Sequence, residues 1–378
     1  RNNHRFSTRR FSMSKAAELA NLIGNINAGG GGVNRNVLIN GAMNVATRST
    51  SEAALGADTT TYRTVDRWKI DVNGTDGRFT MSQDSSAPSG FANSTKFDCT
   101  TADTSIAAGE FFQFQQRIEG QNLQGFIKGS SDAKPFAVSF YVKGNASATY
   151  TAELFDNDNS RQISKTFSVT TDWTRVELTY PADTTGAFDD DNASSLNLNI
   201  WLHAGSTYNS GTLNSSSWAS NTSANRVSSG NTSFFDSTDR TFFITGVQLE
   251  VGQNPTEFEH EKFSQTLQKC QRYFRTFGGN SGNERVAVGF YYSSTGFRTI
   301  IPLSPEMRAT PSLTVITDNQ MHVEAIGSSN SNSGHSLDQA SPKAAAVNVT
   351  TTHSKTAGQA GQLMFNGSDN RLTLEAEL

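Results

Sequence analysis

Two short stretches of this chain have residue types and spacing that suggest metal chemistry. His260-Glu261 opens like the H-E-x-x-H helix of zinc proteases, but Ser264 stands where the second histidine must be, which excludes that site. Residues 156–160 (DNDNS) begin like a calcium loop, yet Arg161 and Phe167 occupy the places of the required glycine and bidentate carboxylate. We therefore expect a hairpin turn there, with a structural cation as the alternative.

No other catalytic signature is present in the sequence. It contains neither a G-x-S-x-G nucleophile elbow nor a G-x-x-x-x-G-K phosphate loop, and its six histidines show no motif spacing. A carboxylate pair for glycoside cleavage is defined by a separation in space, so the sequence leaves that possibility open. We expect a protein that is not an enzyme and that binds no metal or cofactor.

Glycan recognition is the other chemistry that the residue types suggest. Aromatic rings stack on sugar faces, and amide side chains hydrogen-bond sugar hydroxyls. The polar segment 203–233 contains both, and its candidate glycan-binding residues are Tyr208, Asn214, Trp218 and Asn221. The alternative for Trp218 is that its ring folds back onto the domain. A second candidate surface, which equally fits a trimer core, consists of Tyr291, Tyr292 and Phe297.

Composition and charge favour an all-β protein with a neutral polar surface. Hydrophobic residues make up 35% of the chain and charged residues 17%, and the 25 Phe and 31 Gly fit short strands joined by turns. The net charge of −4 argues against nucleic-acid binding. No apolar run approaches the ~20 residues that span a bilayer, and no secretion signal is visible, so we expect cytoplasmic synthesis without membrane insertion. Cys99 and Cys270 are expected to be buried free thiols.

The first 32 residues are expected to anchor and oligomerise the chain. A basic arm comes first, and its candidate anchoring residues are Arg5, Phe6, Arg9, Arg10 and Phe11. An amphipathic helix follows, with an apolar stripe that includes Leu19, Leu22, Ile23 and Ile26. A helix this short is marginal alone, so the stripe must pack either in a trimeric bundle or on its own domain. Residues 29–32, all glycine, then form a linker.

The remainder is expected to form two β domains joined by a helix. The predicted units are an antiparallel jelly-roll β-sandwich over 33–260, a linking helix over 261–277 and a small C-terminal β domain over 278–378. Period-two patterning predicts sandwich strands at 111–115, 136–142, 150–154, 173–178 and 196–202. C-terminal strands are expected near 285–291, 299–303, 312–317, 363–365 and 372–377, and residues 328–334 read as a polar loop.

Several motifs together resemble a module of tailed-phage structural proteins, especially tail fibres and other virion appendages of marine, cyanophage-like phages. They lie at residues 36–45, 62–68, 173, 184–186, 243–252, 258–260 and 270–274, and residues 302–311 resemble the small domain that often follows the module. The resemblance implies a jelly roll related to carbohydrate-binding modules, assembly into homotrimers and a place in the virion. It carries over no catalytic residue.

The motif residues also have structural interpretations of their own. In Asp66-Arg67-Trp68, a carboxylate and a guanidinium beside a large ring are expected to pin an inter-sheet edge, because a buried charge needs a partner. Gln248 and Glu250 share one face of the last sandwich strand and are expected to satisfy backbone groups. Arg272 and Tyr273, at a helix end, are expected to cover the base of the sandwich.

These observations lead to a non-enzymatic virion protein, a fibre or appendage subunit that contributes to attachment to host-surface glycans. The N-terminal arm would contact other virion proteins. The alternative is a capsid or tail decoration protein that makes only virion contacts, and the third hypothesis is a tailspike that depolymerises polysaccharide. The sequence leaves the host, the receptor and the location on the virion open.

Overall fold

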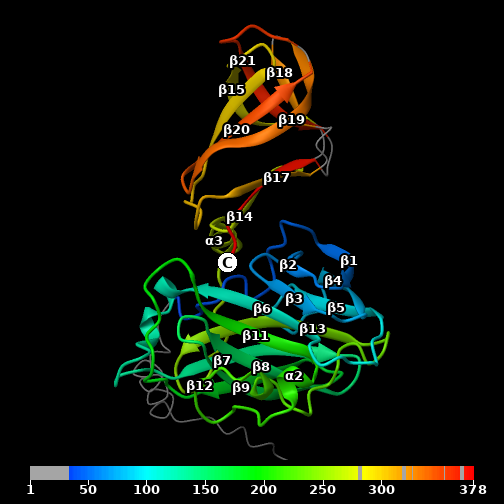
Figure 1. Ribbon diagram of the computed structural model, residues 1–378, viewed down its shortest axis with the longest axis vertical. Helices are drawn as coiled ribbons and strands as arrows, with labels where there is room; N and C mark the ends of the chain where they lie inside the picture. Colours follow the sequence, from blue (N-terminus) through cyan, green and yellow to red (C-terminus); the bar gives the residue numbers. More distant parts are fainter. Residues whose placement is uncertain (1–33, 280–282, 317–320, 326, 353, 367–369) are drawn as a thin grey trace, which may run out of the picture.

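The computed structural model describes residues 34–279, 283–316, 321–325, 327–352, 354–366 and 370–378. The arm and helix expected in residues 1–32 lie outside the described residues, as do all nine candidate anchoring residues. The described strands all pair antiparallel, so the predicted mainly β fold class is confirmed. Figure 1 shows a large sandwich joined through α3 and β14 to a smaller barrel.

The sandwich consists of two antiparallel sheets. The six-stranded sheet runs in the order β1 (Ser51–Gly56), β4 (Arg78–Asp84), β5 (Ser94–Thr101), β13 (Thr241–Val251), β7 (Phe136–Gly144) and β10 (Thr174–Tyr180). The seven-stranded sheet runs in the order β12 (Ala219–Ser220), β9 (Arg161–Val169), β8 (Ala148–Asp156), β11 (Ser194–Ala204), β6 (Phe111–Glu119), β3 (Lys69–Asn73) and β2 (Thr60–Tyr62). Short helical turns are η1 (Gly120–Asn122), η2 (Gln124–Phe126), α2 (Ser206–Asn209) and η3 (Ser223–Asn225).

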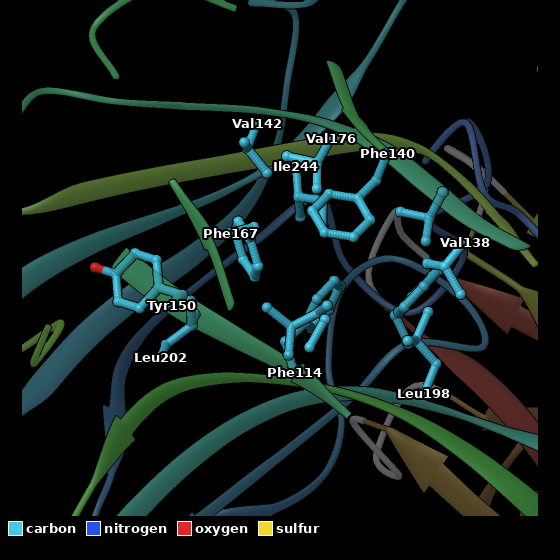
Figure 2. Close-up of a cluster of buried hydrophobic side chains, with 14 of the residues drawn as sticks. Phe114, Val138, Phe140, Val142, Tyr150, Phe167, Val176, Leu198, Leu202 and Ile244 are labelled. Carbon is cyan, nitrogen blue, oxygen red and sulfur yellow. The ribbon is translucent and has the colours of Figure 1, made fainter. Parts of the chain in front are cut away.

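The core lies between the two sheets because alternate side chains of each strand point inward. In β11 the inward residues are Leu196, Leu198, Ile200 and Leu202, all within the main apolar cluster. Figure 2 shows Leu198 and Leu202 facing Phe140, Val142 and Ile244 of the opposite sheet. The intervening residues of β11 must therefore lie on the outer face of the seven-stranded sheet.

The closing strand β13 has a register shift at Gly246, within the motif at 243–252 of the phage-like resemblance. Its pairing with β7 shifts register between Thr245 and Gln248, and Gly246 has φ of +62°. A Cβ at this position would lie 2.7 Å from the Phe91 ring and 2.9 Å from the Tyr141 ring. Glycine is required here for both the backbone conformation and the close packing.

The C-terminal part begins with α3 (Phe263–Gln271). This is the linking helix predicted over 261–277, and it ends six residues earlier than predicted. A three-stranded sheet has the order β14 (Phe274–Gly278), β22 (Arg371–Glu375) and β17 (Ser312–Ile316). A closed barrel has the order β15 (Asn283–Tyr291), β16 (Gly296–Pro302), β20 (Ala344–Thr351), β19 (Ser328–Ser341), β18 (Met321–Ala325) and β21 (Ala360–Asn366). The polar loop predicted at 328–334 is wrong, because β18 and β20 hydrogen-bond this segment into β19.

Two further expectations concern the whole chain. Cys99 and Cys270 are free and buried, as predicted. Within the described ranges, none of the helices combines the length and apolar character that crossing a bilayer requires.

Candidate functional site

Trp218 does not face solvent in the segment predicted to bind glycan. It is 7% exposed, its ring centroid lies 5.3 Å from that of Phe136, and its Nε1 donates a 2.9 Å hydrogen bond to the carbonyl oxygen of Pro181. Burying this large ring against the core removes much apolar area from water and satisfies its N–H group. The prediction of Trp218 as a glycan ligand is therefore wrong, and the alternative of a folded-back ring is what the structure has.

Tyr208 also packs inward, at the other end of the same segment. Its ring centroid lies 5.4 Å from that of Phe111 and 5.2 Å from that of Trp201, and Val227 completes this small apolar cluster. The segment thus lies against the outer face of the seven-stranded sheet and covers its Trp201 end. A candidate site on this outer face must therefore lie away from Trp201, where the segment does not cover the sheet.

The two predicted asparagines are attached to β9 and its turn rather than to a common pocket. Asn214 donates from Nδ2 to the Gln162 carbonyl oxygen at 2.7 Å. Asn221 is exposed, and its backbone N–H donates to the Ser160 carbonyl oxygen at 2.8 Å. The four residues predicted from the loop therefore contact different parts of the sandwich and do not form one binding site.

A different group of sugar-compatible side chains lies on the outer face of β8, β11 and β6. Phe155 is half-buried there, and Asn197 pairs with it on one side and with Arg117 on the other. The exposed Asn157 donates from Nδ2 to Asn197 Oδ1 at 3.0 Å. We call Arg117, Phe155, Asn157, Asn197 and Arg226 the Phe155 face. It combines a half-buried ring with amide and guanidinium groups.

Arg226 is held against the Phe155 ring by a buried carboxylate. Its Nε and Nη2 donate to the Glu153 carboxylate at 2.7 and 2.8 Å, and its Cζ lies 4.8 Å from the ring centroid of Phe155. Asn199 and Trp201 each donate a further 2.9 Å hydrogen bond to Glu153 Oε2. Burial opposes the charge of Arg226, but Glu153 outweighs this effect and raises the pKa of Arg226. Glu153 therefore holds Arg226, Asn199 and Trp201 in place beside Phe155.

A row of polar groups continues beside the Phe155 face. Gln115 lies opposite Asn199, donates from Nε2 to Asp71 at 3.1 Å and accepts a 3.1 Å bond from Arg117 Nε. Asn199 Oδ1 is buried and has no hydrogen-bond partner among the described residues. Gln115 and Asn199 are both buried, at 1% and 2% exposed, so these polar side chains make their hydrogen bonds beneath the surface beside the Phe155 face.

Residues 156–160 form the hairpin turn between β8 and β9, as predicted, and the cation beside them is a lysine. Lys128 Nζ lies 2.6 Å from Asp156 Oδ2 and 3.1 Å from Asp183 Oδ2. It also donates to the backbone carbonyl oxygens of residues 185 and 186 at 2.9 and 2.7 Å. Four oxygen atoms therefore surround the Lys128 ammonium group, at the place where the sequence allowed a structural metal ion as the alternative.

Glu119, at the end of β6, is held by residues of the C-terminal motif. Arg272 donates to it from Nε at 2.9 Å and from Nη2 at 2.8 Å, and the Tyr273 hydroxyl donates to the same carboxylate. Burial raises the pKa of Glu119, but these hydrogen bonds outweigh burial and hold the pKa below its usual value. Glu119 is thus an ionised structural group, and Arg272 and Tyr273 contact the base of the sandwich.

The described residues contain no cluster of three or more His, Cys, Asp or Glu side chains that could hold a metal ion. The buried carboxylates Glu119, Glu153, Asp156 and Asp183 each contact a cation. A glycosidase needs one carboxyl group that is protonated at working pH and a second that acts as base or nucleophile. Each of these four carboxylates has a cationic partner within the fold.

The Asp66-Arg67 motif acts at the domain junction, which corrects the predicted role at an inter-sheet edge. Asp66 accepts hydrogen bonds from the backbone and hydroxyl of Thr47 at 3.1 and 2.5 Å. Arg67 is 1% exposed, forms an ion pair with Glu377 of the C-terminal part, and lies with its Cζ 3.4 Å from the Tyr273 ring centroid. The buried guanidinium therefore takes its partner from the other domain, not from its neighbour.

Trp68, the third residue of that motif, belongs to the core. Its ring stacks on Phe114 with centroids 4.8 Å apart, and its Nε1 donates to the Asn40 carbonyl oxygen at 3.1 Å.

Gln248 and Glu250 organise the loop that follows β13. Gln248 Oε1 accepts the backbone N–H of Glu259 at 2.8 Å, and Glu250 Oε1 accepts that of Thr256 at 2.7 Å. Both side chains are at most 1% exposed, so they satisfy backbone groups and are not available to a ligand.

The second candidate surface is only partly exposed. Tyr291 and Phe297 are fully buried in the barrel core, so their prediction as a contact surface is wrong, whereas Tyr292 is 46% exposed. Strand alternation places other large apolar residues beside Tyr292 on the outside of β15 and β16. We call Val288, Phe290, Tyr292 and Ile300 the barrel strip; their exposed fractions are 70%, 47%, 46% and 62%.

The sequence interpretation missed the Phe155 face although a signal for it was present. The strand predicted at 150–154 extends through Phe155. Because side chains alternate with period two, the Phe155 ring lies on the same face as Glu153. Asn197 has the matching position in the strand predicted at 196–202. Only the pairing of β8, β11 and β6, which no local pattern specifies, brings Arg117 into the same group.

Comparisons with known proteins gave matches only among solved structures. No family model matches the chain, and no curated protein matches it. A family 11 carbohydrate-binding module from Clostridium thermocellum, in complex with a β-1,3-1,4-mixed-linked tetrasaccharide, is 11% identical with a TM-score of 0.28, covering 56% of this chain and 99% of that chain. The CBM22-1 xylan-binding domain from Paenibacillus barcinonensis Xyn10C is 11% identical with a TM-score of 0.27, covering 54% and 97%.

One match is to a phage protein. The enzymatically active domain of tailspike protein 4 from bacteriophage CBA120 is 14% identical with a TM-score of 0.28, covering 57% of this chain and 21% of that chain. The identities and TM-scores of all three matches are too low to carry a functional argument.

Proposed function

We propose that this chain is a non-enzymatic subunit of a phage virion appendage and that its sandwich binds a host-surface glycan on the Phe155 face. The observation that carries the glycan part is the half-buried Phe155 ring with Asn157, Asn197 and Arg117 around it. A pyranose stacks its C–H face on such a ring while its hydroxyls bond the planar polar groups at the edge.

The ordering of these side chains before a ligand arrives supports the same proposal. The Glu153 carboxylate fixes the Arg226 guanidinium, which in turn lies against Phe155. Side chains that are already held lose less conformational entropy on binding. The virion part of the proposal is supported by the tailed-phage motifs of the sequence, with Gly246, Arg67 and Glu250 in defined structural roles.

Removal of the Phe155 ring tests the glycan part. The full chain is screened against an array of bacterial surface glycans, and affinity for the best ligand is then measured by calorimetry. Phe155→Ala is expected to weaken binding at least about tenfold, equivalent to about 1.4 kcal/mol, because the stacking platform is lost.

The matched control is Phe263→Ala, which removes a ring that is 58% exposed on α3, away from this face. We expect this control to bind like the parent chain. Equal affinities of the parent and Phe155→Ala would contradict the Phe155 face as the site.

The depolymerase hypothesis is tested with the same ligand. Incubation with the purified chain is expected to leave the length distribution of the polysaccharide unchanged in size-exclusion chromatography. Shortened products would contradict the non-enzymatic proposal. A decoration protein without a receptor role would instead bind none of the glycans.

Assembly of several copies is part of the proposal, and the barrel strip supports it. Four large apolar side chains, three on the adjacent strands β15 and β16 and Tyr292 directly after β15, form an exposed surface of the kind that marks an interface. We expect the parent chain to associate in sedimentation equilibrium and Ile300→Lys to shift the population toward monomer. Because Ile300 is already 62% exposed, thermal stability should change little.

Ile106→Lys is the control for this assembly prediction, because Ile106 is 45% exposed on the sandwich. It should leave the association unchanged. If Ile300→Lys and Ile106→Lys associate equally, the barrel strip is not the interface.

A further inference from the structure

A hollow of about 320 Å³ lies between the sandwich and the C-terminal part, apart from the Phe155 face. Arg48, Arg63 and Glu52 line it from the sandwich, and Arg371 and Glu375 line it from the C-terminal part. Three guanidinium groups therefore share this space with two carboxylates.

Two of the three arginines are paired with acids. Arg48 Nη2 lies 3.2 Å from Glu375 and 3.0 Å from Glu377, and Arg63 Nη1 lies 3.0 Å from Glu52. Glu377 is in turn matched by Arg67, so it leaves no negative charge to spare for the hollow.

Arg371 has no such partner among the residues that the structure describes. It donates only to the backbone carbonyl oxygens of Thr47 and Arg48, and no carboxylate among the described residues lies within 4.0 Å of its guanidinium nitrogens. In addition, the buried Nε atoms of Arg48, Arg63 and Arg371 have no acceptor among the described residues. A cluster of guanidinium groups with unused donors, one of which no described carboxylate matches, is a site for an anion.

We propose that this hollow binds a saccharide through an anionic substituent, a carboxylate or a phosphate ester, with the anion at Arg371. Hydroxyls of Thr61 and Thr314, one from each side of the hollow, are available to the neutral part of such a ligand. The ligand would bridge the sandwich and the C-terminal part. This site stands independently of the Phe155 face.

Calorimetry on the full chain tests the proposal with two anionic probes, trigalacturonate and glucose 6-phosphate. Their neutral matches are methyl-esterified trigalacturonate and glucose. We expect at least one anionic probe to bind, its neutral match not to bind, and Arg371→Gln to weaken the binding at least about tenfold. The anionic probe that binds identifies the substituent, and affinity should fall as salt rises from about 50 to about 500 mM.

A rim variant guards against a loosened junction in Arg371→Gln. Arg63→Gln changes a side chain that is 40% exposed. It is expected to weaken binding of the anionic probe and to leave the thermal unfolding profile unchanged. Phe155→Ala should bind the anionic probe like the parent chain, which separates this site from the proposed glycan face. Binding of neither probe, equal binding of the neutral matches, or full affinity in both arginine variants would overturn the proposal.

Discussion

Lys128→Met is expected to lower the free energy of unfolding of the sandwich by about 3–5 kcal/mol, because it leaves the buried Asp156 without a cation and Asp183 with Arg161 alone. The side chains of Lys128 and Asp156 are 0% exposed, and that of Asp183 is 4% exposed. Methionine keeps the apolar stem but removes the ammonium that contacts both acids. Urea denaturation at neutral pH, followed by tryptophan fluorescence, measures the loss.

Lys134→Met is the matched control, because Lys134 is exposed in the same connection between η2 and β7. Its effect should stay within about 0.5 kcal/mol. Equal losses in the two variants would contradict the role assigned to Lys128.

The same ion cluster predicts a pH dependence. Burial raises the pKa of Asp183, but hydrogen bonds from Arg161 and Lys128 outweigh it and hold the pKa below its usual value. A carboxyl with a lowered folded pKa stabilises the fold above its unfolded pKa of about 3.9, and this contribution is lost as pH falls through the folded pKa. Urea denaturation of the parent chain should therefore show a loss of stability below about pH 4. The opposite trend would exclude this electrostatic account.

Glu377→Gln is expected to destabilise the domain junction by about 3–5 kcal/mol. The variant leaves the Arg67 guanidinium, which is 1% exposed, without its carboxylate and weakens the contact of Arg48. Differential scanning calorimetry should show the C-terminal part unfolding at a lower temperature than in the parent chain, separated from the sandwich.

Glu375→Gln supplies the control two residues away. The Glu375 side chain is 38% exposed and also contacts Arg48, so its loss should cost at most about 1 kcal/mol. If Glu375→Gln destabilises the junction as much as Glu377→Gln, burial of the Arg67 pair is not what holds the two parts together.

Local pattern was sufficient for much of the fold. Alternation at 136–142 and 196–202 predicted β7 and β11, since inward residues such as Phe140 and Leu198 recur with period two. The linking helix predicted over 261–277 corresponds to α3, which is shorter (Phe263–Gln271). These elements are specified by their own side chains, so their sequence alone identifies them.

Contacts between distant residues could not be predicted in this way. Arg67 and Glu377 are 310 residues apart, and no local signal selects that partner over the adjacent Asp66. Strand β19 is rich in Ser and Asn, and barrel closure rather than strand propensity orders it. The polar residues around Trp218 are typical of a glycan-binding segment. Burial of its ring in the core nevertheless stabilises the fold more than exposure would, and the residue is buried. Binding faces depend on strand pairing, which is why the Phe155 face was missed.

An NMR titration of the isotope-labelled chain with the best glycan from the array tests whether the Phe155 face binds it. We expect resonances of Phe155, Asn157, Asn197 and Arg117 to shift together and to saturate at the calorimetric affinity. Shifts centred on segment 203–233 or on the barrel strip, with the Phe155 face unperturbed, would contradict this expectation.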